Sequence, residues 1–233
     1  MKVYSYLSID SFANCYLVLN EVTKQALIID PGEIQVPIIE NIEINKMKLI
    51  AVLVTHNHEA HTKGLSTLKK IYDFEVYGAD SEMTGKAANV LAGDGSITIA
   101  GMKISHYMIP GHSADSLVYK IENVLFTGDT LMGGYIGTTN TNYARKTLIN
   151  NIKSKLLTQS YDTIIMPGHG PISTIEAEIE FNADIVGKIA RDKEKEKYAS
   201  EVFNRDEKNE GWFTPPSYKR GDNDYEEDDE FNL

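Results

Sequence analysis

His56-Asn57-His58-Glu59-Ala60-His61 is the stretch that decides the fold of this chain. It follows the apolar run 49–54, which is rich in β-branched residues and predicts a buried strand. Packing of a buried strand does not require three histidines directly after its C-terminal end. Imidazole is a preferred ligand of zinc, copper and iron in proteins. The stretch therefore indicates a metal site where a strand ends in a loop.

Three more polar residues stand at similar positions. His112 and His169 each follow a Pro-Gly pair, and Asp129 lies in a Thr-Gly-Asp-Thr segment, each after a short apolar strand pattern. Loops that a rigid sheet holds in place are a usual position for functional residues. The candidate metal ligands are His56, His58, His61, His112, Asp129 and His169.

Two other residues carry no such prediction. His106 lies in the middle of a predicted strand and fits none of these motifs, so we interpret it as structural. Cys15 is the single cysteine, which excludes a disulfide within the chain. We expect it to pack inside a strand.

In their order along the chain, the histidine and aspartate segments resemble the metallo-β-lactamase-fold superfamily. The Asp30-Pro31-Gly32 turn is similar to an early strand-turn of that family, and the resemblance covers roughly residues 1 to 190. The short spacings between the segments are more similar to compact glyoxalase II-type hydrolases than to flavodiiron proteins. The resemblance implies a four-layer αββα sandwich, whereas periodicity alone predicts only an α/β fold.

The resemblance also implies a role for each candidate ligand. His56, His58 and His112 would hold one metal ion, and His61 and His169 a second, with Asp129 bridging the two. No catalytic side chain and no organic cofactor are predicted beyond this set.

Ala60 departs from the family pattern, which has an aspartate ligand of the second metal at this position. The neighbouring Glu59 is expected to point elsewhere. The second metal would keep two imidazoles and one carboxylate, a ligand set typical of non-haem iron sites with open positions. We therefore expect two metal ions, with iron favoured and zinc as the alternative, because zinc accepts the same donors.

Two functions fit this site. The favoured interpretation is a non-haem diiron protein that binds dioxygen reversibly as an oxygen sensor, similar to stand-alone oxygen-binding diiron proteins related to flavodiiron proteins. The alternative is a dinuclear-metal hydrolase of a thioester, similar to glyoxalase II. Against the hydrolase, the second site lacks one ligand, and the acidic C-terminal segment is shorter than the basic helical domain with which such enzymes bind glutathione. A weak oxygen reductase and a metal protein with another role are further interpretations.

Composition limits the partners and the location. A net charge of −11 argues against nucleic acid, whose phosphates require basic side chains. The chain has no apolar run of about 18 residues that would span a membrane and no signal-peptide core. With one cysteine and 42% apolar residues, we expect a cytoplasmic globular protein.

Two regions are predicted along the chain. Residues 1–200 form the metal domain, and residues 201–233 an aromatic and proline-bearing segment with an acidic end. The acidic end is interpreted as a solvated tail, or as a docking segment for a signalling protein or for a second copy in a homodimer. Predicted helices span 34–45, 62–72, 144–157 and 174–199, and predicted strands 2–9, 14–19, 25–29, 49–54, 75–77, 97–99, 102–109, 116–121, 123–127 and 164–166.

Overall fold

The computed structural model describes residues 1–186, so the segment 201–233 and its two interpretations lie outside the described residues. Two mixed six-stranded sheets form the centre of the described part. In the first sheet the strands follow the order β1 (Lys2–Leu7), β2 (Asn14–Leu19), β3 (Gln25–Ile29), β4 (Lys48–Leu53), β5 (Glu75–Gly78) and β8 (Asn89–Val90). In the second they follow the order β16 (Ser173–Thr174), β15 (Ile164–Pro167), β12 (Val124–Gly128), β11 (Leu117–Ile121), β10 (Met102–Met108) and β9 (Gly95–Ile99).

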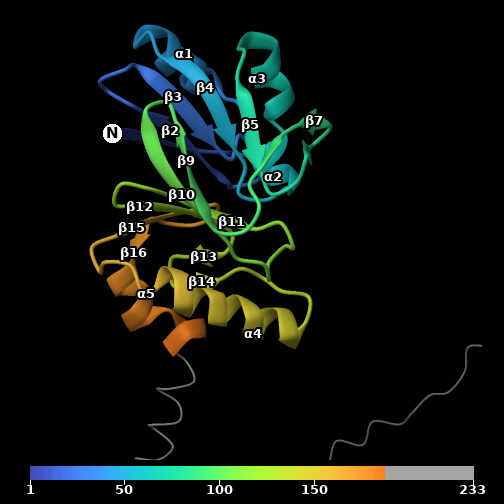
Figure 1. The fold of residues 1–233 in the computed structure, drawn as a ribbon, viewed down its shortest axis with the longest axis vertical. Helices are drawn as coiled ribbons and strands as arrows, with labels where there is room; N and C mark the ends of the chain where they lie inside the picture. Colours follow the sequence, from blue (N-terminus) through green and yellow to red (C-terminus); the bar gives the residue numbers. More distant parts are fainter. Residues whose placement is uncertain (187–233) are drawn as a thin grey trace, which may run out of the picture. The chain divides into compact units, whose positions relative to one another are not determined.

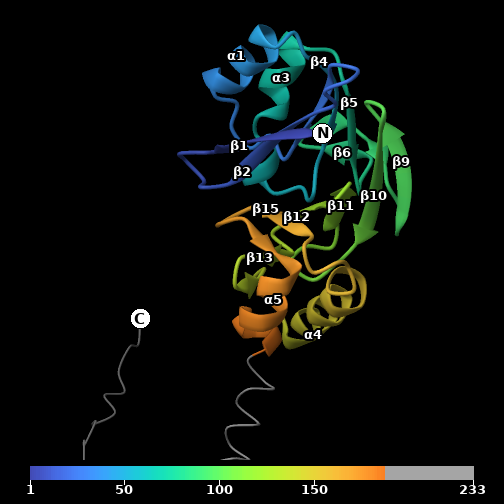
Figure 2. The ribbon, with the colours of Figure 1, turned by 90° about the vertical axis from the view of Figure 1, so that its left-hand side faces the viewer.

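Helices cover the outer faces of both sheets. Figure 1 shows α1 (Val36–Ile44) and α3 (Leu65–Ile71) beside the first sheet, and α4 (Asn142–Asn151) and α5 (Ile175–Phe181) beside the second. The turned view in Figure 2 shows the same layering. The αββα sandwich expected from the sequence is therefore confirmed.

Strand β2 shows why both faces of the first sheet must be covered. All six of its residues are buried. Leu17 and Leu19 pack toward the helix side, while Tyr16 and Val18 pack between the sheets. Since side chains alternate along a strand, a strand whose residues are all buried needs a packing partner on each face.

The remaining elements are short. Helix α2 (Glu59–Thr62) precedes α3, and α4 continues into the π-helical turn η1 (Ile152–Leu156). Two small hairpins, β6 (Glu82–Met83) with β7 (Lys86–Ala87) and β13 (Leu131–Met132) with β14 (Tyr135–Ile136), complete the described part. No helix in residues 1–186 has the length and apolar character needed to cross a membrane.

Two predicted helices differ from the structure. The helix predicted over 62–72 is divided into α2 and α3 at Gly64, whose backbone packs so closely on Pro31 that an added Cβ would lie 2.5 Å from the Pro31 carbonyl oxygen. The helix predicted over 174–199 is interrupted at Asn182, which has a non-helical ψ of 111°. Its amide donates to Glu178 at 2.5 Å, and the part beyond residue 186 lies outside the described residues.

Candidate metal centre

The predicted ligands lie where strands end. His56 and His58 follow β4, His61 lies in α2, His112 follows β10, Asp129 follows β12, and His169 follows β15. The two sheets meet at this end, where the Leu117 amide donates to the Thr55 carbonyl at 2.8 Å. The strand ends thus bring residues far apart in sequence to one place.

Potential ligand atoms converge in two overlapping groups in the described residues. One group contains His56, His58 and His112, and the other contains His56, His61 and Asp129, with the ligand atoms of each group within 4.8 Å of one another. Five of the six predicted ligands belong to these groups. Their role as ligands stays a prediction, but the clusters are consistent with a dinuclear metal site.

Two nitrogen atoms at the centre lack a hydrogen-bond partner. The Nε2 atoms of His56 and His61 are buried and unpaired among the described residues. Asp129 Oδ2 lies 3.9 Å from the first and 3.5 Å from the second. A buried polar atom without a partner costs free energy. A metal ion would satisfy both nitrogens, so the residues present fit a metal.

A buried carboxylate behind the histidines sets their protonation. Asp30 Oδ2 lies 2.6 Å from Thr55 Oγ1, which donates to it, and 3.1 Å from His61 Nδ1. Thr55 Oγ1 in turn lies 3.0 Å from His56 Nδ1. With both Nδ1 atoms placed as donors, Nε2 of His56, and Nε2 of His61 once that imidazole has lost its second proton, direct a lone pair toward the centre. Such outer hydrogen bonds fix the tautomer of metal-binding histidines.

His58 and His112 form the more open side of the centre. His112 Nε2 lies 3.2 Å from His58 Nδ1, and His112 Nδ1 lies 3.0 Å from the Thr138 carbonyl oxygen. The carbonyl can only accept, so Nδ1 of His112 carries the proton and its Nε2 presents a lone pair. His58 Nδ1 can donate to this lone pair, and both nitrogens could bind a cation when the proton of His58 is on its Nε2.

His169 is placed differently from the other five residues. It belongs to neither metal group, and its Nδ1 donates to Asp129 Oδ1 at 2.7 Å. Its ring centroid lies 5.1 Å from that of His61. The structure therefore brings His169 to the centre through Asp129, and the role expected for it as a ligand of the second metal stays a prediction.

The two buried histidines, His56 and His61, have pKa values shifted in opposite directions. Burial, together with the neighbouring His61, lowers the pKa of His56 to about 3. Burial also lowers the pKa of His61, but Asp30 and Asp129 outweigh it and raise this pKa to about 10. Burial raises the pKa of Asp129, but the hydrogen bond from His169 and the nearby His61 outweigh it and hold this pKa well below its ordinary value. An anionic Asp129 among imidazoles is suited to hold cations.

Ala60 borders a cavity that none of the six candidate ligands lines. The cavity has a volume of about 240 Å³, and Ala60 lines it together with Ser8, Glu33 and Lys63. Glu59 is exposed and belongs to neither metal group. The structure thus gives no carboxylate from Glu59 in place of the one missing at Ala60.

A glycine and a histidine outside the ligand set have structural roles. A Cβ at Gly168 would lie 2.5 Å from Asp129 Oδ1 and 2.7 Å from His61 Cε1, so only glycine fits there without displacement. His106 is buried and lies apart from both metal groups, with its Nδ1 3.1 Å from the Gly93 carbonyl oxygen. This position is that of a structural residue.

A family model named "Metallo-beta-lactamase superfamily" matches residues 9–169, which include all six predicted ligands. The chain belongs to the metallo-β-lactamase superfamily. Its fold and the arrangement of its candidate ligands agree with that membership.

Curated relatives of this superfamily member include hydrolases. The hydroxyacylglutathione hydrolase of Chromohalobacter salexigens is 29% identical over 157 residues, which cover 66% of this chain and 60% of that protein. The enzyme of the same name from Dechloromonas aromatica is 33% identical over 129 residues, 55% of this chain and 48% of that protein. The chain thus spans about half to three-fifths of these two relatives. A Bacillus subtilis protein named "Probable metallo-hydrolase YqgX" is 29% identical, covering 75% of this chain and 93% of that protein.

Solved structures agree on the fold. The crystal structure of the BLEG-1 B3 metallo-β-lactamase has a TM-score of 0.71 at 27% identity, covering 79% of this chain and 99% of that chain. TTHA1623 in a di-iron-bound form has a TM-score of 0.66 at 22% identity, covering 77% of this chain and 98% of that chain. The latter likeness supports the fold alone.

One functional residue escaped the sequence analysis. Asp30 was noted only as part of a turn, yet it links Thr55 and His61 at the centre. Its backbone φ of 52° is unusual for a residue other than glycine. The signal was an aspartate directly after a buried strand, the same signal that identified Asp129.

Proposed function

We propose that this protein is a dinuclear-metal hydrolase of thioesters. The observation that carries the proposal is the pair of buried, unpaired Nε2 atoms of His56 and His61 facing Asp129. Relatives named hydroxyacylglutathione hydrolase support the substrate class. They favour the hydrolase over dioxygen binding, which was the favoured interpretation from sequence.

The residues have separable roles in such a reaction. His56, His58 and His112 would hold one metal, His61 and His169 the other, and Asp129 would bridge them. When bound, the two metals supply a nucleophilic water at neutral pH and polarise the thioester carbonyl. Asp30 keeps the proton of His61 on Nδ1, away from the centre. Thr138 does the same for His112.

Thioester hydrolysis after defined metal loading tests this proposal. The assay follows release of the thiol from a hydroxyacyl-glutathione thioester with zinc-loaded and with iron-loaded protein. Asp129→Asn should abolish turnover, because it removes the bridging charge. Asp94→Asn, which alters a carboxylate bound to Lys155 at 2.8 Å outside the metal centre, is the matched control. Absence of turnover in protein that holds two metals per chain would contradict the proposal.

A second function follows from Ala60. With a methyl group where the family has a carboxylate, the second metal would have one carboxylate and two imidazoles among its protein ligands, a set that suits ferrous iron and dioxygen. We propose reversible dioxygen binding by a diiron form as this second candidate, with oxygen sensing as its use. The sensor role, a signalling partner and a homodimer also remain proposals, as does docking through residues 201–233.

Metal analysis separates the two candidates. Protein purified anaerobically from iron-replete cells should contain iron and change its visible spectrum in air if the second candidate holds. Recovery of zinc alone, without a spectral change in air and with thioester turnover, would leave the hydrolase.

A further inference from the structure

The structure assigns a second ligand site, for an organic phosphate, to a cavity that extends from the end of the sandwich opposite the metal centre along β10 and β11. The cavity has a volume of about 560 Å³, within the usual range for small-molecule sites. None of the six candidate metal ligands lines it. This proposal is independent of the reaction proposed above.

Strand directions place this cavity away from the metals. His112 and Asp129 follow the C-terminal ends of β10 and β12. Gly101 and Glu122, which line the cavity, precede the N-terminal ends of the same two strands. The turn after β2 contributes Asn20, at the end of β3 opposite to Asp30.

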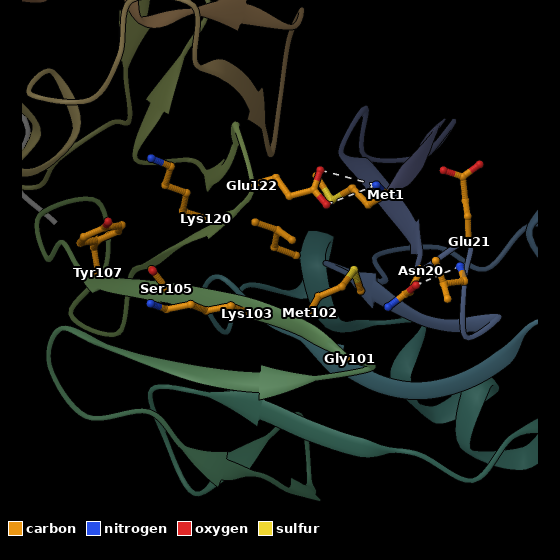
Figure 3. A pocket seen from close by; sticks show the side chains of 12 residues that line it. Met1, Asn20, Glu21, Gly101, Met102, Lys103, Ser105, Tyr107, Lys120 and Glu122 are labelled. Atoms are coloured by element: carbon orange, nitrogen blue, oxygen red, sulfur yellow. Dashed lines mark hydrogen bonds and ion pairs between the residues drawn. The ribbon is translucent and has the colours of Figure 1, made fainter.

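One side of the cavity gathers hydrogen-bond donors. Lys103, Ser105 and Tyr107 alternate along β10 and so share one face, and Lys120 of β11 is paired with Ser105. Figure 3 shows these four side chains on the same side of the cavity. Two ammonium groups and two hydroxyls are a donor set suited to a phosphate group.

These donors are largely uncommitted. Within residues 1–186, neither Lys103 nor Lys120 forms an ion pair, and no hydrogen bond involves the side chains of Lys103, Ser105 or Tyr107. Lys120 donates only to the Gln159 side-chain oxygen, at 2.6 Å. In a chain of net charge −11, two cations that share one cavity and form no ion pair in the described residues are available to an anion.

The rest of the cavity favours an organic body on that phosphate. Its lining includes the apolar side chains of Val22, Met102 and Ile121. Two carboxylates, Glu21 and Glu122, also line the cavity, and the Met1 ammonium lies 3.3 Å from Glu122 and partly neutralises it. A phosphomonoester with an apolar group matches both the hydrogen-bond donors and the apolar side chains of this cavity.

Binding of phenyl phosphate to the metal-loaded protein tests the site, with inorganic phosphate and benzoate as comparison probes. Calorimetry should show tighter binding of phenyl phosphate than of either probe. Lys103→Gln and Lys120→Gln should each weaken it about tenfold, since each removes one charged hydrogen bond. The double variant Lys70→Gln with Lys153→Gln, which alters two exposed lysines outside the cavity, should bind as the unmodified protein does.

A second readout needs no variant. Phenyl phosphate should protect Lys103 and Lys120, but not Lys70, from acetylation as measured by mass spectrometry. Binding that persists in Lys103→Gln with Lys120→Gln would come from the metal centre and would overturn the proposal. Absence of binding, equal binding of benzoate, or equal acetylation of all three lysines with and without phenyl phosphate would also overturn it.

Discussion

Replacing Asp30 by asparagine should weaken the binding of the second metal while leaving the fold in place. Asp30 is buried, and its two carboxylate oxygens face three donors: the Thr55 amide at 2.7 Å, the Thr55 hydroxyl at 2.6 Å and His61 Nδ1 at 3.1 Å. Asparagine keeps the shape of the side chain but replaces one oxygen by an NH₂ group. One of the two acceptor positions is therefore lost.

Both orientations of the new amide have a cost. If its NH₂ group faces the Thr55 amide, two buried donors meet, at a cost of about 1–3 kcal/mol. If the NH₂ group faces His61 instead, it meets the Nδ1–H donor of that imidazole. His61 avoids this clash by carrying its proton on Nε2, the atom that faces the metal centre. Loss of an outer hydrogen-bond partner typically lowers metal affinity about 10- to 100-fold. We expect a loss of this size for the site that contains His61.

Competition with a chelator measures this loss. Metal content per chain is determined by elemental analysis after dialysis against graded chelator, for the unmodified protein and for Asp30→Asn. Asp94→Asn is the control, because Asp94 is also a hydrogen-bonded carboxylate, accepting from the Met108 amide at 2.9 Å, but lies outside the metal groups. If Asp30→Asn retains two metals at the same chelator concentration, Asp30 does not set the proton of His61.

Three further changes test the site and the core. Ala60→Asp should tighten the second metal, since residue 60 precedes His61 and the family has a carboxylate ligand at this position; unchanged chelator resistance would show that residue 60 does not reach that metal. Gly168→Ala should lower both metal content and melting temperature, because the added Cβ would lie 2.5 Å from Asp129 Oδ1; full metal content at an unchanged melting temperature would refute that packing. Burial raises the pKa of the Cys15 thiol, so native protein should react with a thiol reagent only as fast as it unfolds, and rapid labelling would mean that β2 opens locally.

The central strands could be predicted because burial on both faces leaves a strong pattern. The run 49–54 and residues 15–19 are apolar, and both belong to strands inside the first sheet. The strands of β6, β7 and β8 have two residues each, too few to show any period. The break at Gly64 depends on its contact with Pro31, a tertiary contact that helical periodicity does not contain.

The candidate ligands could be predicted for a different reason. Five of them follow the end of a strand, His61 lies in the short helix after β4, and strand ends of one sandwich converge in space. The hydrogen bonds that orient them could not be predicted, because Asp30 reaches residues 25 and 31 positions away. The orientation of His169, whose Nδ1 is occupied by Asp129, likewise depends on contacts across 40 positions.

Ala60 is the residue on which the choice between the two functions depends. The other candidate ligands suit a hydrolase and a dioxygen-binding protein equally, because both need neutral imidazoles around a bridging carboxylate. A missing carboxylate lowers the negative charge around the second metal, which weakens its binding and leaves a position open. In a hydrolase this is a loss that Ala60→Asp should repair, raising thioester turnover together with metal affinity. In a dioxygen-binding protein the open position is the useful feature, so the same change should suppress the spectral response to air. Measuring turnover and spectrum on this one variant therefore assigns the function that the ligand set alone leaves open.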